Sequence, residues 1–557
     1  MIGLLAALTL AGGGPANVLV LYSSDDAGSA AIAMHYADAR SIPAPQLCGL
    51  GGLDPTMLAL PFAAYEASIR LPFEACLAAA PQPDDLDYVV VVRGLPIRVD
   101  LDGGGPVSLT SLLAVHRAAR DDGTELAGAP QKATEGVLAP GVPNPVYQQV
   151  PVADGAYALT NPSAAWYASS LRIVKAAEQP ASFRRRSAGH AGGYGFDGNL
   201  FVVTRLDGFD DDDAHALIDR AVAGDGKYPS AELLCMAGAD EARAARDPEC
   251  EYATRHLALA GYTASYLAPH DPSLSGRTVA AYFTGAADLH GAIDGLTYVP
   301  GALVDNLTSL GAVPENFVCA NGACPSAEQQ TSIARLVRAG ATGVHGAVAE
   351  PLNSCFPNAG ALLLYTFGYG MGESVLFAER FLYWQNLLVG DPLAAPWATR
   401  PKVTLVAADL QVSVSATHPD GVAGLALYAD GVRVATSDGA PIAWTAPSYD
   451  THLLAVATAK NALALREGWP NPAQRPRPDV QGWATVTLNA PVPEPPAEPT
   501  PDVGADVAPA APLAASGGCA TSGRSASWLA LLLLALTGIA PTIRGRRIDP
   551  RAGTASR

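Results

Sequence analysis

Carboxylates and other polar side chains follow several strand-like runs of this 557-residue chain. They are Asp25, Asp26, Asp207, Thr284, Asp305, Asn306 and Glu350. Because strand ends in an open α/β sheet converge on one crevice, we expect these groups to share a cleft. Grouped carboxylates can bind a divalent cation or work as an acid/base pair. An Asp after a strand can equally cap the next helix, so both interpretations stay open.

A second chemistry needs a thiol and an imidazole. His290-Gly291 and the later Cys324 would make a Cys–His pair, in which the ring activates the thiol. A disulfide between Cys319 and Cys324 would instead leave no thiolate there. His345 and Cys355 come from one strand-like run and its loop, and we predict that His345 is a lone histidine of a surface turn.

The eight cysteines contain no C-x-x-C pair, which argues against a zinc ribbon. The spacings of Cys235 with Cys250 and of Cys319 with Cys324 predict short disulfide loops in an oxidising compartment. Cys48 and Cys76 offer a further pairing. Cys355 is then free, and Cys519 lies in the tail.

Alternating strands and helices must position these groups. Buried strands are predicted over 17–22, 88–94, 199–204, 263–268, 278–283 and 343–348, and helices over 30–39, 62–80, 214–223, 329–339, 362–367 and 372–388. This alternation predicts a three-layer, mainly parallel sheet over residues 17–398. The turn after residues 17–22 has no G-x-G-x-x-G or Walker pattern, so no nucleotide site is expected there.

From residue 401 to 490 the pattern changes to seven short alternating strands. Ala429-Asp-Gly431 is a hairpin signal between two of them. Seven strands in fewer than 100 residues predict an immunoglobulin-like or fibronectin-like β-sandwich.

The two ends of the chain carry targeting signals. Residues 1–16 resemble a secretory signal peptide, and residues 491–518 form a Pro-rich linker. The apolar run 525–543 is long enough to cross a bilayer, and arginines follow it, which predicts a transmembrane helix. The net charge of −18 argues against nucleic acid as a partner.

Several motifs occur in an order that resembles an uncharacterised family of secreted bacterial proteins over residues 17–398. They are Arg93-Gly-Leu-Pro-Ile, Arg205-Leu-Asp-Gly, Asp305-Asn-Leu-Thr-Ser, Gly340-Ala-Thr-Gly with Glu350-Pro, and Gly390-Asp-Pro-Leu. The strand order and the closing Gly-Asp-Pro are similar to those of gingipain-type, caspase-like cysteine peptidases. Such peptidases carry His-Gly after one strand and Cys after the next. Here Thr284-Gly285 and Asp305-Asn306 follow the corresponding strands, so the resemblance implies the fold without the dyad.

The last segment, residues 519–551, resembles the MYXO-CTERM sorting signal, which implies processing near Cys519 and display at the cell surface or outer membrane. We therefore expect a surface-anchored, caspase-like domain that binds a ligand, a protein or a peptide at its strand ends. The alternatives are a cysteine peptidase using His290 and Cys324, and a carboxylate- or metal-dependent hydrolase. No cofactor is expected, except for a divalent cation in the last case.

Overall fold

A computed structural model describes residues 13–101, 105–116, 133–134, 137–138, 142–144, 147, 201–320, 323–325, 330–382, 384–460 and 480–490. Contacts divide the chain into residues 1–492 and 493–557. The predicted linker, sorting signal and apolar run 525–543 lie outside the described residues, as do residues 1–12. Within the described ranges, no helix combines the length and apolar character needed to cross a membrane.

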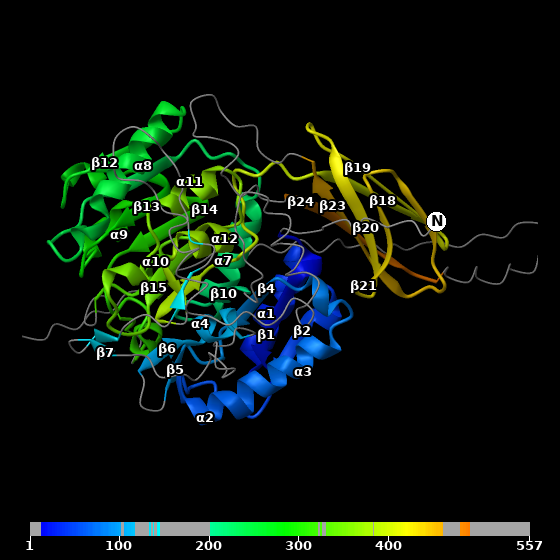
Figure 1. Cartoon of the computed structure of the whole chain (residues 1–557), viewed down its shortest axis with the longest axis horizontal. Helices are drawn as coiled ribbons and strands as arrows, with labels where there is room; N and C mark the ends of the chain where they lie inside the picture. The colour runs from blue at the N-terminus through cyan, green and yellow to red at the C-terminus, as the bar shows by residue number, and fades with distance from the viewer. Residues whose placement is uncertain are drawn as a thin grey trace, which may run out of the picture. The chain divides into compact units, whose positions relative to one another are not determined.

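A ten-stranded, mostly parallel sheet organises the first part of the chain (Figure 1). Its strand order is β12 (Ala264–Leu267), β11 (Glu232–Met236), β13 (Thr278–Thr284), β14 (Thr297–Asn306), β15 (Gly343–Ala347), β17 (Asn386–Val389), β10 (Val202–Leu206), β4 (Tyr88–Val92), β1 (Val18–Ser23) and β2 (Leu47–Leu50). β15 and β17 run antiparallel to each other. The mixed α/β class that the sequence predicts is therefore confirmed.

Helices cover both faces of this sheet, because its strands are apolar on both sides. In β1, Val18 and Val20 face one core and Leu19 and Leu21 face another. The first core includes α1 (Ala27–Arg40), α7 (Asp211–Gly224) and α10 (Ile333–Arg338). The opposite face packs against α3 (Leu71–Ala79), α4 (Leu109–Ala114), α8 (Asp247–Leu259), α11 (Gly360–Thr366) and α12 (Met371–Ala378). A continuous apolar run, with successive side chains buried on opposite faces, is what a central parallel sheet requires.

One predicted helix, over 372–388, is wrong in its second half. α12 ends at Ala378, and Glu379 has an extended backbone with φ −80° and ψ 124°. The segment from Asn386 to Val389 is strand β17, which pairs with β15. A short apolar run fits a buried strand and a buried helix equally well, so periodicity does not distinguish them.

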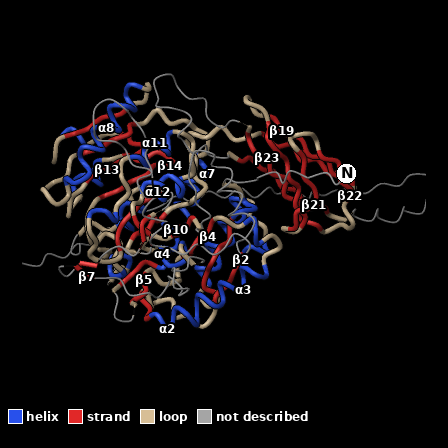
Figure 2. Tube along the Cα trace, viewed as in Figure 1, coloured by secondary structure: helices blue, strands red, loops and turns tan. Residues whose placement is uncertain are grey.

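Among its described residues, the segment after residue 400 consists of strands joined by loops and turns, without a helix, as Figure 2 shows. One sheet has the order β18 (Lys402–Ala408), β19 (Gln411–Thr417), β22 (Ile442–Thr445). The other has the order β21 (Val432–Ser437), β20 (Val422–Ala429), β23 (Thr451–Ala459), β24 (Gln481–Leu488). All pairs are antiparallel, and side chains from both sheets share one core, including Val412 and Leu453. All seven strands fall where the sequence predicts them.

Candidate functional site at the strand ends

The ends of β13 and β14 hold structural side chains. Asn306, the last residue of β14, accepts from the Ala286 N–H at 2.8 Å through Oδ1 and donates to the Ala286 carbonyl at 2.8 Å through Nδ2. The Thr284 carbonyl at the end of β13 accepts from Arg246 at 2.7 Å. Asn306 therefore ties two strand ends together and has no nucleophilic group.

None of the cysteines in the described residues is an exposed thiol. Cys324 is disulfide-bonded to Cys319, and Cys48 is bonded to Cys76. Cys355 is fully buried, and burial together with Glu379 raises its pKa. A buried thiol with a raised pKa is inert, because the thiolate is the nucleophile. His290 begins α9 (His290–Gly295), and its side chain lies outside the description.

The predicted disulfide between Cys235 and Cys250 is not formed, and both residues are free thiols. Both are buried in the core between β11 and α8. Burial and the neighbouring Cys250 raise the pKa of Cys235. The intervening residues include the end of a strand and the start of a helix, so the spacing does not mark an exposed disulfide loop.

Asp305 lies in a sealed ionic network, not in an open cleft. Arg246 of the 3-10 turn Ala244–Arg246 donates to Asp305 Oδ1 at 2.7 Å, and also to the carbonyls of Pro357 at 3.1 Å and Thr284. Burial alone would raise the pKa of Asp305, but Arg246 and His345 hold it below its usual value. Arg246 and Asp305 thus form a buried, charge-balanced pair.

His345 is not in a surface turn as predicted. It lies in β15 and is fully buried, with Nδ1 3.0 Å from Asp305 Oδ2 and Nε2 3.5 Å from Glu379 Oε1. The Phe356 ring packs edge-on against the imidazole at 5.4 Å. A single His-Gly pair in the sequence does not indicate whether the histidine is buried. Here it is buried because β15 is a central strand of a sheet that is covered on both faces.

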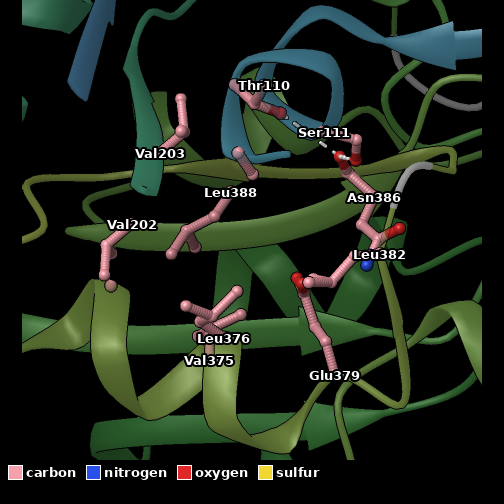
Figure 3. A pocket seen from close by; sticks show the side chains of 12 residues that line it. Thr110, Ser111, Val202, Val203, Val375, Leu376, Glu379, Leu382, Asn386 and Leu388 are labelled. Carbon is pink, nitrogen blue, oxygen red and sulfur yellow. Dashed lines mark hydrogen bonds between the residues drawn. The ribbon is translucent and has the colours of Figure 1, made fainter. Parts of the chain in front are cut away.

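A small interior cavity of about 30 Å³ lies beside this network (Figure 3). Glu379 and Asn386 line it together with the hydroxyls of Thr110 and Ser111, and apolar side chains such as Leu376 form the remaining wall. Its volume suits one or two water molecules. Burial raises the pKa of Glu379 well above its usual value. The cavity is too small for a substrate.

The predicted cluster of carboxylates is divided between separate places. Glu350 is exposed and accepts from the Ser309 hydroxyl at 2.6 Å, whereas Asp305 is fully buried. Asp25 is also exposed, and its carboxylate accepts from the Gly52 N–H at 2.6 Å. Among the described residues, no group of three His, Cys, Asp or Glu side chains could hold a metal ion.

Two of the quoted motifs interlock at the ends of β4 and β10. Arg205 is fully buried and donates to Asp207 Oδ2 at 2.6 Å, and to the carbonyls of Leu95 and Pro96 at 2.7 and 2.9 Å. Asp207 in turn accepts from Arg93 Nη1 at 3.1 Å. The Arg205-Leu-Asp segment therefore fixes the Arg93-Gly-Leu-Pro turn and holds Arg93 in place.

An open pocket of about 370 Å³ lies over these interlocked turns. Its lining residues are Asp26, Pro55, Thr56, Leu58, Arg93, Gly94, Arg205, Asp207, Phe209, Asp211, Phe317, Val318 and Cys319. The chain passes from β1 to β2 on one side and then to β4 on the other, so this is the point where the strand order reverses. Ligands of open α/β sheets bind outside the strand ends at such a point.

Arg93 was not among the predicted site residues. It directly follows a buried strand, which is the same signal that identified Asp207. Of the seven residues expected to share one cleft, Asp26 and Asp207 line this pocket, and Thr284, Asp305 and Asn306 do not. Arg246 had no comparable signal, because it lies in an irregular stretch rich in charged residues.

The chain matches no known family model and no curated protein sequence. Among solved structures, a chain of the complex of Porphyromonas gingivalis RgpB pro- and mature domains is similar at a TM-score of 0.39 and 12% identity, over 85% of this chain and 100% of that one. A structure described as a protease is similar at a TM-score of 0.41 and 11% identity, over 86% of this chain and 98% of that one. Likenesses at this level assign neither a site nor an activity.

Proposed function

We propose that this protein binds a small ligand in the pocket at the ends of β1, β4 and β10, and that it does not hydrolyse peptides. The observation that carries the proposal is the pocket itself, with the half-buried Arg93 held at its wall. A volume of about 370 Å³ lies in the range of small-molecule sites. The positions of a peptidase dyad are meanwhile used for structural hydrogen bonds.

We further propose that the protein consists of a caspase-like domain followed by an immunoglobulin-like β-sandwich. The strand order β12-β11-β13-β14-β15-β17, with the last strand reversed against its neighbour, supports the first part. Seven antiparallel strands in two sheets with a shared core support the second.

We also propose that the protein is secreted and held at the cell surface by its C-terminal signal. The disulfides Cys48–Cys76 and Cys319–Cys324 fit an oxidising compartment. A leader that ends before Pro15 would fit this proposal, because Ala16 is buried against Tyr428 and Leu454 and the Pro15 carbonyl accepts from Gln46 at 3.1 Å.

A thermal-shift screen tests ligand binding. Amino acids, sugars, dicarboxylates and polyamines would be tested against the wild type and against Thr56→Trp, whose indole would occupy the pocket. Ser230→Trp is the matched control, because Ser230 is exposed in a separate groove near the start of β11. We expect at least one compound class to stabilise the wild type and the control but not Thr56→Trp. If no class does so, the proposal is wrong.

The peptidase alternative has its own test. Fluorogenic peptides and a thiol-reactive label would be applied to the unreduced protein, with Cys324→Ala and Cys355→Ala as comparisons. We expect neither hydrolysis nor labelling of either cysteine in the folded state. Hydrolysis that one of these substitutions abolishes would overturn the proposal.

A further inference from the structure

The geometry of this pocket points to a zwitterionic α-amino acid as its ligand; this inference rests on the proposed function and names its substrate class. Three kinds of group meet in one pocket: a guanidinium, carboxylates and an apolar wall. An α-amino acid is the smallest common molecule that complements all three.

Arg93 is placed to receive the carboxylate of such a ligand. Its Nε donates to Asp211 Oδ1 at 3.1 Å, and its Nη1 donates to Asp207 Oδ1 at 3.1 Å and to the Gly208 carbonyl at 3.0 Å. No hydrogen bond from Nη2 to any described residue is found, and the side chain is 28% exposed. A guanidinium held in this way presents Nη2 as a fixed donor, which suits a charge-assisted hydrogen bond to a carboxylate.

Asp26 and Asp211 are placed to receive the ammonium group. Asp26 Oδ1 accepts from the Gly28 N–H at 3.0 Å at the start of α1. Its Oδ2 packs against Gly94 in the turn after β4, so closely that a Cβ atom at residue 94 would lie 2.7 Å from it. Asp211 Oδ2 lies close to Gly28, so both carboxylates border the first turn of α1.

The charges of the pocket also favour a ligand with an ammonium group. Arg205 and Asp207 form a buried pair, and Arg93 is shared between Asp207 and Asp211. The pocket contains two arginines against Asp26, Asp207 and Asp211, so one carboxylate is in excess. A ligand that brings only a carboxylate would increase this excess, whereas a zwitterion leaves it unchanged and adds an ammonium group that can donate to Asp26 and Asp211.

The remaining wall is apolar and comes from several loops. Leu58 follows β2, Phe209 precedes α7, and Phe317 and Val318 follow β14. Val318 is 50% exposed, so part of this apolar wall can be reached from solvent. The wall therefore predicts a ligand with an apolar side chain, such as leucine or phenylalanine.

Calorimetric titration of the full chain with L-leucine tests the inference. Leucinamide lacks the carboxylate, and 4-methylpentanoate lacks the ammonium. We expect each to bind at least about tenfold more weakly than leucine, since each loses a charge-assisted contact. Arg93→Gln should remove the preference over leucinamide, and Asp211→Asn should remove the preference over 4-methylpentanoate.

Far-UV circular dichroism and the melting temperature of each variant show whether it is folded. Equal affinity for leucine and both analogues in the wild type would overturn the inference, and so would binding of Gly-Leu or Leu-Gly in place of leucine. If another compound class binds in a way that Thr56→Trp blocks, while no amino acid binds, this inference fails and the proposed function stands. If no compound binds, both fail.

Discussion

The two arginine–aspartate pairs at the strand ends have the same chemistry and opposite surroundings. Arg246 and Asp305 have side-chain exposures of 6% and 1%, so both members of the pair are buried. Arg93 and Asp207 have exposures of 28% and 1%, so one member faces solvent. The first pair combines an arginine, an aspartate and the neighbouring His345 but has no access to solvent, whereas the second borders an open pocket.

Neighbouring loops explain the difference. The segment from Asn353 to Pro357 closes over Arg246, whose guanidinium donates to the Pro357 carbonyl at 3.1 Å. At the other pair, Gly94 has a φ of +92°, a conformation that favours glycine, and the turn leaves space above Arg93. Burial and charge alone therefore do not identify a site, and access decides which pair can meet a ligand.

Breaking the sealed pair should have the largest effect. Asp305→Ala leaves the Arg246 guanidinium buried without its carboxylate, and we expect a loss of about 3–5 kcal/mol in the free energy of unfolding. Urea denaturation would measure it. Asp294→Ala is the matched control, because Asp294 forms an exposed pair with Arg335 and should cost no more than about 1 kcal/mol. An equal loss of unfolding free energy in both variants would contradict the assignment of Asp305 to a buried ion pair.

Asn306→Ala should have the next largest effect. The substitution leaves the N–H and the carbonyl of Ala286 without their side-chain partner, which typically costs about 1–3 kcal/mol for a buried group. The measurement is again urea denaturation. Asn353→Ala removes one exposed hydrogen bond, to the Ala242 carbonyl, and serves as the control with a smaller expected loss. An unchanged free energy of unfolding for Asn306→Ala would mean that this side chain does not stabilise the fold.

Glu379 should make the stability depend on pH. Burial raises its pKa above the usual value, so its favourable contribution is complete in acid and is lost as the pH rises through the folded-state pKa. Asp305 has a lowered pKa and acts in the opposite sense, losing its contribution in acid. Glu379→Gln mimics the protonated form, so we expect its melting temperature to exceed that of the wild type at about pH 8 and to approach it near pH 5.

Differential scanning calorimetry across this pH range would test the expectation. Glu350→Gln is the matched control, because Glu350 is exposed and should show little pH-dependent difference from the wild type. A constant difference between Glu379→Gln and the wild type at every pH would show that Glu379 does not change its protonation in this range.

Much of the architecture can be predicted from short-range sequence patterns. Which polar residues at the strand ends are buried and which line an open pocket cannot. Apolar runs such as 17–22 and 199–204 predict strands where β1 and β10 lie, and Asp26 and Asp207, which follow these two strands, line the same pocket. Whether a strand-end residue is sealed depends on loops distant in sequence. The Pro357 carbonyl accepts a hydrogen bond from Arg246, and Phe317 lines the same pocket as Arg93. No local sequence pattern indicates either arrangement.

The smallest stability change should come from the open pair. In Arg93→Gln, Asp207 keeps its hydrogen bonds from Arg205 at 2.6 Å and from the Gly208 N–H at 2.8 Å, so the buried carboxylate remains satisfied. We expect a loss of no more than about 1 kcal/mol in urea denaturation, as for a partly exposed ion pair. Arg335→Gln, which removes the partly buried partner of the exposed Asp294, is the control. A loss as large as that of Asp305→Ala would show that Arg93 is a structural residue. A small loss would mean that stability does not explain why this half-buried arginine is held at the wall of an open pocket, and ligand binding would remain as the explanation.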